Sequence, residues 1–214
     1  MRSRFDEQLQ QLNKKMIEMG AMCEELIALA AKALMAADTD LAARVKAQGV
    51  DIDQMEREIE SLCMKLLLHQ QPVAGDLRQI SAALKMVTDM ERIGDQAEDI
   101  AELVRYLPDH PLEDTDLIAE MARSTISMVT GSIDAYVKQD VTLASRVLEQ
   151  DDAVDDYFLK MKNSIIRHIA QHPQEGEFAL DLLMISKYFE RIGDHATNIA
   201  EWVIYSVTGV HKGV

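Results

Sequence analysis

The sequence predicts an all-α protein of six long antiparallel helices, arranged as two tandem three-helix bundles. Helix-favouring Ala, Leu, Met, Glu and Gln abound, while only 4 Pro and 9 Gly interrupt the 214 residues. Apolar residues recur at steps of three and four along much of the chain. A pattern of about 100 residues then repeats, which indicates that one unit of three helices is present twice.

Turn signals divide the chain into six segments. They lie at residues 37–40, at Pro72, at Pro108 and Pro111, at residues 139–142 and at Pro173. The first three segments form a first unit, residues 1–107, and the last three a second unit, residues 108–214. Short connections between long helices favour antiparallel neighbours in a bundle, so each unit is expected to be a three-helix bundle.

The first, second and fifth segments each carry a heptad seam. In the first, Phe5, Leu9 and Leu12 begin a series of alternating steps of four and three that continues to residue 33. Similar seams cover residues 52–66 and 154–168. Cys23 lies on the first seam and Cys63 beside the second, so both are expected to be small buried side chains.

The third and sixth segments differ because one of their faces changes from apolar to acidic. Apolar residues between positions 77 and 87 lie on the same helical face as Glu91, and from Glu91 onward this face is acidic. Another face remains apolar, so the helix is expected to pack on one side and present carboxylates on another. The motif Glu-Arg-Ile-Gly-Asp from Glu91 to Asp95 recurs unchanged from Glu190 to Asp194.

These carboxylates are candidate metal ligands. Like charges one helical turn apart repel unless solvent, arginine, protons or a cation compensates them, and helical bundles often bind metals through carboxylates from facing helices. Because the donors are oxygens and no His lies at ligand spacing, Mg²⁺, Mn²⁺, Ca²⁺ or iron fits best. The candidates are Asp53, Glu91, Asp95 and Asp99 in the first unit, with Glu56 one turn beyond Asp53, and Asp151, Asp155, Glu190, Asp194 and Asn198 in the second.

A solvated acidic face is the main alternative, but the exact repetition of the motif favours a site. Gly94 and Gly193 support the site, because Gly inside a helix costs about 1 kcal/mol relative to Ala. A close neighbour, room for a ligand or tight helix packing would each explain them. Arg92 and Arg191 are expected to neutralise nearby acids, since no glycine-rich phosphate loop is present. His195 points away from the acidic face and is expected to be structural or to lie in the second shell of a site.

The composition excludes several other functions. A formal net charge of -15 argues against nucleic acid or an anionic membrane surface as a direct partner, because both require an excess of Lys and Arg. No signal peptide, disulfide framework or membrane span is visible, so a cytoplasmic protein is expected. No nucleophile and base are paired, and no Glu-x-x-His of the di-iron carboxylate type occurs, so no enzymatic activity is expected. A carboxylate-bridged iron oxidoreductase and a metal-free helical adaptor remain alternatives.

The motifs QPVAGDLR at 71–78 and ERIGD at 91–95 resemble the first half of the PhoU family of phosphate-uptake regulators, and ERIGDHATNIAE at 190–201 resembles its second half. The resemblance implies a cytoplasmic, often dimeric protein without catalytic activity. It also implies negative regulation of phosphate uptake and phosphate-starvation signalling. The expected partners are the ATPase of a phosphate ABC transporter and a sensor histidine kinase, and the membrane would be reached only through such partners.

The resemblance further implies divalent metal ions or a multinuclear metal cluster, of iron, manganese, magnesium or zinc. Some members of the family bind such metals through acidic pairs spaced four residues apart, which here correspond to Glu91 with Asp95, Asp151 with Asp155, and Glu190 with Asp194. Gly49 departs from this pattern, because an acid usually stands at this position in the first unit. The first site is therefore expected to bind metal more weakly, or to use Asp99 or Glu56.

Overall fold

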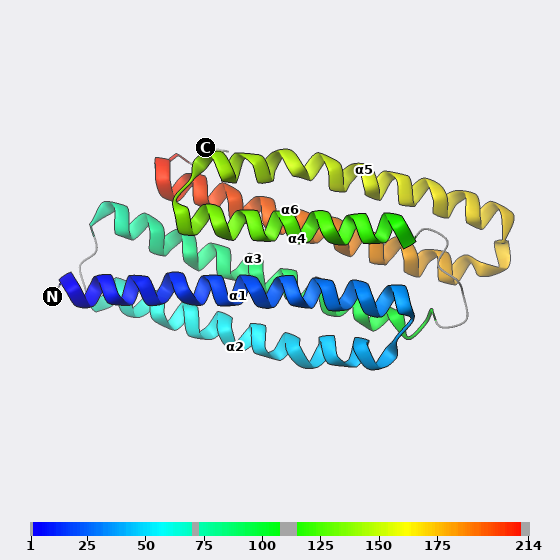
Figure 1. The fold of residues 1–214 in the computed structure, drawn as a ribbon, viewed down its shortest axis with the longest axis horizontal. Coiled ribbons are helices and arrows are strands. Elements are labelled where there is room, and N and C mark those ends of the chain that lie inside the picture. The colour runs from blue at the N-terminus through cyan, green and yellow to red at the C-terminus, as the bar shows by residue number, and fades with distance from the viewer. Residues whose placement is uncertain (1, 70–72, 108–114, 211–214) are drawn as a thin grey trace.

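A computed structural model describes residues 2–69, 73–107 and 115–210 of the protein (Figure 1). All regular secondary structure in these ranges is helical, which confirms the all-α prediction. The elements are α1 (Arg2–Ala36), α2 (Thr39–His69), α3 (Ala74–Val104), α4 (Thr115–Lys138), α5 (Val141–Gln171), the short 3₁₀ helix η1 (Pro173–Glu175) and α6 (Gly176–Thr208).

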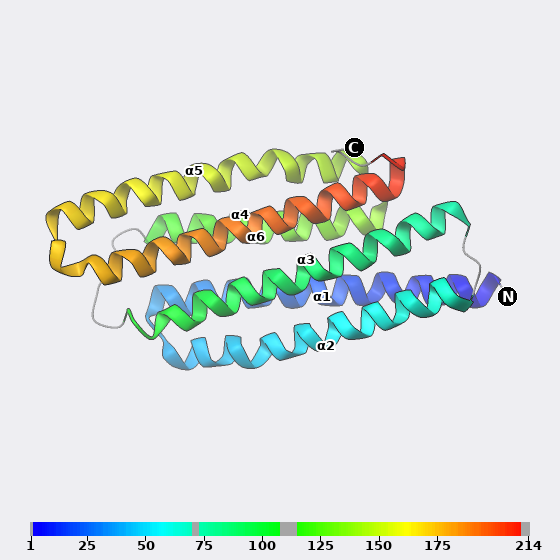
Figure 2. The same ribbon diagram turned by 180° about the vertical axis from the view of Figure 1, so that it is seen from behind.

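The two halves of the chain form two three-helix bundles that lie side by side. Helices α1, α2 and α3 pack against one another, as do α4, α5 and α6, and the bundles meet through α1 with α4 and α3 with α6. Helices α3 and α6 run in opposite directions along this interface (Figure 2). The predicted division at residues 107 and 108 falls beside residues 108–114, which lie outside the described residues, and it stays a prediction.

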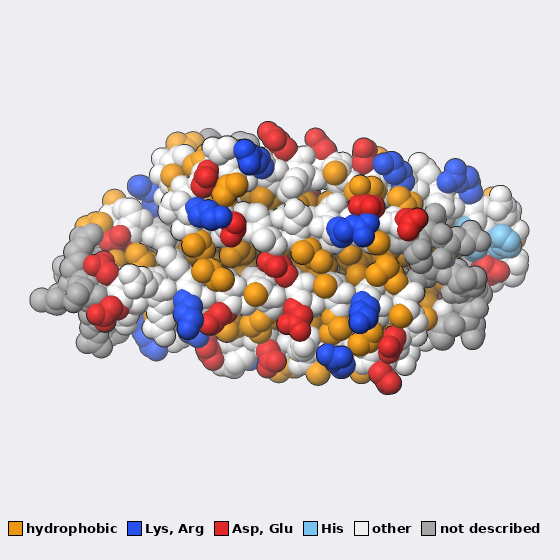
Figure 3. Space-filling model, in the orientation of Figure 1, with side chains coloured by type: hydrophobic (Ala, Val, Ile, Leu, Met, Phe, Trp, Pro, Cys, Tyr) orange, Lys and Arg blue, Asp and Glu red, His pale blue; other side chains and the backbone are white. Residues whose placement is uncertain are grey.

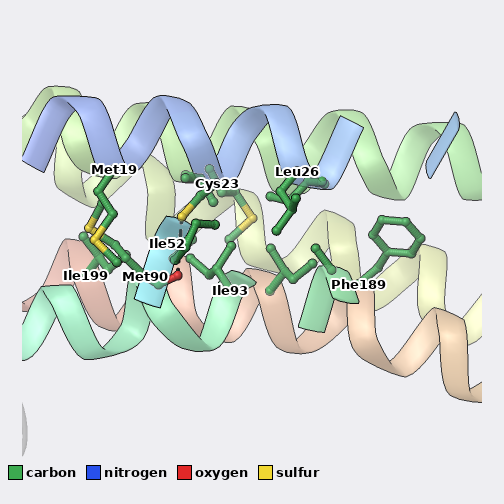
Figure 4. Packing of buried hydrophobic residues seen from close by; sticks show 14 of the residues in the cluster. Met19, Cys23, Leu26, Ile52, Met90, Ile93, Phe189 and Ile199 are labelled. Carbon is green, nitrogen blue, oxygen red and sulfur yellow. Dashed lines mark hydrogen bonds between the residues drawn. The ribbon is translucent and has the colours of Figure 1, made fainter. Parts of the chain in front are cut away.

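One layer of buried side chains continues through both bundles. Figure 4 shows Met19 of α1, Met90 of α3 and Ile199 of α6 together between the helices, and all three are inaccessible to solvent. Cys23 and Cys63 are also buried, as the seams predict, and the Cys23 thiol donates a hydrogen bond to the Met90 carbonyl oxygen at 3.4 Å. The heptad seams therefore form the core that holds α3 and α6 in place.

The repeat extends to the turns that start the second helix of each bundle. Ala37 and Gln139 adopt left-handed backbone angles, with φ of 49° and 52°. The next residues, Asp38 and Asp140, each accept hydrogen bonds from two backbone amides at the start of α2 and α5. These contacts satisfy amide groups that a helix start leaves unpaired. Within the described residues, none of the helices is both long and apolar enough to cross a membrane.

Candidate metal centre

Three carboxylates of the first unit come together where α2 packs against α3. Asp53 of α2 and Glu91 and Asp95 of α3 each offer one oxygen, and these oxygens all lie within 4.8 Å of one another. The spacing of four residues places Glu91 and Asp95 on one face of α3. The structure thus assembles three of the ligands that the sequence predicts for the first site.

Arg92 provides the positive charge at this cluster. Its Nη1 lies 2.8 Å from Asp95 Oδ2, and its Nε lies 3.4 Å from Glu91 Oε2. The Arg92 side chain is half exposed, so another cation can replace it without leaving a buried charge unpaired. The pKa of Glu91 is nevertheless raised, first by burial and then by the neighbouring Asp95. The predicted neutralising role of Arg92 is confirmed.

Glu56 and an open hollow lie at the edges of the first cluster. The pKa of Glu56 is raised by burial and then by Glu91, so its carboxylate lies within the field of the cluster. A hollow of about 460 Å³ opens beside Asp95, and its lining includes Lys46, Arg92 and Arg191. The hollow therefore leaves Asp95, at the edge of the cluster, open to small ions.

Glu98, which the sequence did not single out as a ligand, compensates for the glycine of α2. Gly49 is buried, and a Cβ atom built there would lie 1.7 Å from Glu98 Oε1. The Glu98 carboxylate therefore occupies the space that a side chain at position 49 would need. Burial raises the pKa of Glu98, and Asp95 and Asp53 raise it further. Glu98 thus shares the electrostatic environment of the first cluster.

The corresponding positions of the second unit carry the opposite combination. Asp151 stands where the first unit has Gly49, and Thr197 stands where it has Glu98. Each unit therefore has one carboxylate at this place, supplied by α3 in the first unit and by α5 in the second. The acidic face of α3 includes Glu98, but only the packing of α3 on α2 shows which gap it fills.

Four predicted carboxylates of the second unit lie on α5 and α6, which pack against each other. They are Asp151 and Asp155 of α5 and Glu190 and Asp194 of α6. Burial raises the pKa of Asp151 to about 6, and Asp155, Asp194 and Glu190 contribute in that order. Lys187 Nζ contacts Glu190. Asp151 thus lies in the electrostatic field of the other three carboxylates, but within the described residues no three of these four bring their oxygens within 4.8 Å of one another, as Asp53, Glu91 and Asp95 do.

Asp99 and Asn198, the equivalent residues of the two units, lie at the interface between α3 and α6. Asn198 Nδ2 donates a hydrogen bond to Asp89 Oδ1 at 3.1 Å, and His195 Nδ1 lies 2.9 Å from the same oxygen. Burial raises the pKa of Asp99, while Arg191 of α6 opposes the shift. These contacts join the two bundles. His195 thus contacts the interface and also opposes the rise in the pKa of Glu91, and the Asn198 amide is directed toward α3.

The two motif glycines have different neighbours. A Cβ atom at Gly94 would lie 3.1 Å from Ile52 Cδ1 and 3.2 Å from its Cγ2. At Gly193 it would lie 3.4 Å from Asp151 Oδ1 and 3.5 Å from Val154 Cγ1, which are ordinary contact distances. Gly94 therefore permits close packing on a core isoleucine, whereas Gly193 leaves room beside a carboxylate of the second site.

Comparison with known proteins identifies the family of this chain. The family model described as "PhoU domain" matches residues 16–104 and again residues 118–203, which confirms the tandem repeat. A phosphate-specific transport system accessory protein PhoU homolog from Clostridium acetobutylicum is 35% identical, and the match covers 96% of this chain and 94% of that protein. A homolog of the same name from Synechocystis sp. is 36% identical over 97% of this chain and 93% of its own length.

Two solved structures share the whole fold. The crystal structure of PhoU from Pseudomonas aeruginosa superposes with a TM-score of 0.91 at 33% identity, covering 96% of this chain and 100% of that one. The phosphate transport system regulatory protein PhoU from Streptococcus pneumoniae gives a TM-score of 0.89 at 26% identity, covering 98% and 100%. With two matches to the family model and relatives similar over nearly their full length, the chain belongs to the PhoU family.

Proposed function

We propose that this chain is a non-enzymatic negative regulator of phosphate uptake whose acidic helix faces bind divalent cations. The names of its relatives support the broader part, because they describe accessory and regulatory proteins of phosphate transport systems. The chain matches those proteins over nearly their whole length, which supports the same broad role for it. The proposed partners are the ATPase of a phosphate ABC transporter and a sensor histidine kinase. The chain is proposed to act on them in the cytoplasm as a homodimer.

The observation that carries the metal proposal is the convergence of Asp53, Glu91 and Asp95. Oxygen ligands at about 2.0–2.6 Å from a cation lie at most about 4–5 Å apart. The three oxygens lie within 4.8 Å of one another, so a cation fits among them with small side-chain movements. An oxygen-only donor set favours Mg²⁺, Mn²⁺, Ca²⁺ or iron over softer metals. The charge of Arg92 would then be released from the two acids that it now neutralises.

Glu98 completes the first ligand set in this proposal. Its carboxylate fills the space beside Gly49, where the second unit has Asp151. A cation between α2 and α3, and another between α5 and α6, would relieve the repulsion among carboxylates and cross-link each helix pair. The proposed ligands are Asp53, Glu91, Asp95 and Glu98 in the first site, and Asp151, Asp155, Glu190 and Asp194 in the second.

Metal analysis and thermal unfolding test the cation sites. Untagged protein purified without chelator is expected to contain metal, and chelator-treated protein is expected to gain thermal stability from Mn²⁺, Fe²⁺ or Mg²⁺. The double variant Glu91→Gln with Asp95→Asn should lose this gain at the first site. Glu7→Gln with Glu25→Gln changes the charge equally at exposed positions of α1 and should retain it. Protein without metal and without stabilisation would favour the metal-free adaptor.

A swap between the two units tests Glu98 separately. Glu98→Thr copies the second unit at one position and is expected to weaken cation binding at the first site. Adding Gly49→Asp to Glu98→Thr copies the second unit at both positions and should restore binding. Unchanged affinity in Glu98→Thr would remove Glu98 from the ligand set while leaving the other ligands in place.

The regulatory role is tested in cells and its enzymatic alternative in solution. Protein isolated from phosphate-replete cells is expected to carry the transporter ATPase or a sensor kinase with it, and deletion of the gene should raise phosphate uptake. Unchanged uptake and no captured ATPase or kinase would contradict the regulatory proposal. Turnover of oxygen by the reduced, iron-loaded protein would instead support the oxidoreductase alternative.

A further inference from the structure

A second polar cluster lies at the corner between α5 and α6, at the end of the molecule where histidine atoms reach the surface (Figure 3). The sequence presents His168 only as the last residue of a heptad seam. In the structure, His168, His172 and Glu175 each offer a ligand atom, and these atoms all lie within 4.8 Å of one another. The cluster has no side chain in common with either acidic site.

Backbone hydrogen bonds fix the three residues relative to one another. The His172 amide donates to the His168 carbonyl oxygen at 2.7 Å, and the Glu175 amide donates to the His172 carbonyl oxygen at 3.0 Å. Pro173 begins η1 between them and restricts the backbone of the turn. The main chain thus links each potential ligand directly to the next, so the backbone is already ordered before the side chains converge on a cation.

The side chains also converge in a partly shielded environment. His168 Nε2 lies 2.8 Å from Glu175 Oε2, and the two imidazole rings have centroids 4.8 Å apart. The His168 and Glu175 side chains are only 18% and 26% exposed. The ring of the buried Phe178 meets His168 edge-on, with centroids 6.0 Å apart, and provides an apolar wall.

An ion pair between His168 and Glu175 does not explain the third residue. The Nδ1 atom of His172 is shielded from solvent and has no hydrogen-bond partner. A shielded polar atom without a partner is costly, and coordination to a cation would satisfy it. Two imidazoles and one carboxylate form a donor set that Zn²⁺ uses in open sites, where a fourth position remains for water.

We propose that His168, His172 and Glu175 bind one Zn²⁺ ion, or a transition-metal cation of similar preference, at the corner between α5 and α6. The nitrogen donors separate this site from the oxygen-only acidic sites, which favour harder cations. A bound ion would fasten the end of α5 to the start of α6 through residues that lie on both sides of Pro173. The proposal is independent of the metal sites in the proposed function.

Zinc titration of the full untagged chain tests this site. The acidic sites are first silenced by Glu91→Gln, Asp95→Asn, Asp151→Asn and Asp155→Asn, and the chelator-treated protein is then titrated with Zn²⁺ by calorimetry. About one Zn²⁺ per chain is expected to bind, and adding His172→Ala should weaken that binding at least tenfold. Adding His195→Gln instead, which alters a histidine of the interface between α3 and α6, should leave it unchanged.

Spectroscopy distinguishes coordination from an indirect structural effect. Co²⁺ bound to the silenced variant is expected to give visible absorption of a low-coordinate site, and NMR should show a shift of the His172 Nδ1 resonance when Zn²⁺ is added. Because His172→Ala could disturb the helix end, His172→Gln serves as a second variant, with helicity checked by circular dichroism. The proposal would be overturned if the silenced variant bound no Zn²⁺, or if both folded His172 variants bound Zn²⁺ as tightly as the silenced variant does.

Discussion

Replacing each motif glycine with alanine separates the two explanations for a glycine inside a helix. Alanine is more favourable than glycine by about 1 kcal/mol in a helix interior. At Gly193 the added methyl group meets Asp151 Oδ1 and Val154 Cγ1 at ordinary contact distances of 3.4 and 3.5 Å. Gly193→Ala should therefore raise the free energy of unfolding by about 1 kcal/mol, which for a chain of this size raises Tm by about 2–4 °C.

The same substitution at Gly94 meets a different neighbour. The added methyl group would lie 3.1 and 3.2 Å from two atoms of Ile52, a side chain that is only 1% exposed and packed on all sides. Overpacking of this kind costs about 1–3 kcal/mol, which offsets the gain in helix propensity. Gly94→Ala should therefore change the free energy of unfolding by between about zero and a loss of about 2 kcal/mol.

Urea unfolding of the metal-free protein, followed by circular dichroism, measures both substitutions. The midpoint should rise for Gly193→Ala and stay level or fall for Gly94→Ala, with the same dependence on urea concentration in both. Equal stabilisation by the two alanines would refute the assignment of Gly94 to core packing. In the presence of metal, the methyl group beside Asp151 should weaken binding at the second site only, and unchanged binding there would refute the assignment of Gly193 to ligand room.

Three further predictions test other parts of the structure. Asp151 has a folded-state pKa of about 6, raised by burial and its acidic neighbours, so its contribution to stability is present below its unfolded pKa and is lost as pH rises through about 6. Urea unfolding of the metal-free Asp151→Asn variant should show that its free energy of unfolding falls less than that of the unsubstituted protein as pH rises through about 6. Cys23 and Cys63, whose pKa values burial raises to about 12, should resist thiol reagents at pH 8 until the protein unfolds, as mass spectrometry would show. Asp140→Ala should lower the free energy of unfolding by about 1 kcal/mol because α5 loses its N-cap. Asp140→Asn should keep most of this stability, because the Asn side chain can still cap the helix.

The sequence predicts the fold because the fold depends mainly on periodic patterns. The heptad seam through Met19 and Cys23 defines a buried face without knowledge of its partner, and both side chains are inaccessible in the structure. The repeated motif similarly identifies Glu91 and Asp95 as neighbours, since four residues make about one helical turn. These relations lie within one helix, so they do not depend on which element packs against that helix.

Relations between helices could not be predicted in the same way. On the helical wheel Asp99 lies about 80° from Glu91, a direction that faces either α2 or α6, and only the association of the bundles turns it toward Arg191. Whether the Glu98 carboxylate occupies the space beside Gly49 depends on the axial register of α3 against α2. The periodicity of α5 likewise ends before Pro173, so it cannot predict which way the Glu175 side chain points.

The first unit has Gly49 and Glu98 where the second has Asp151 and Thr197, and this leads to a difference between the two acidic sites. In the proposed ligand sets, α5 supplies both Asp151 and Asp155, whereas α2 supplies Asp53 alone. A helix held by two ligands has to release both before it separates from the cation, so bound metal should protect the amides of α5 more strongly than those of α2. Hydrogen exchange with and without Mn²⁺ measures this protection along each helix.

The double variant that moves the acid from α3 to α2 provides the matched comparison. Gly49→Asp with Glu98→Thr keeps the number of carboxylates in the first site but gives α2 two of them. Metal-dependent protection of α2 should then approach that of α5, while protection of α5 stays unchanged. If α2 were already protected as strongly as α5 in the unsubstituted protein, the number of ligands per helix would not control how firmly each helix is held.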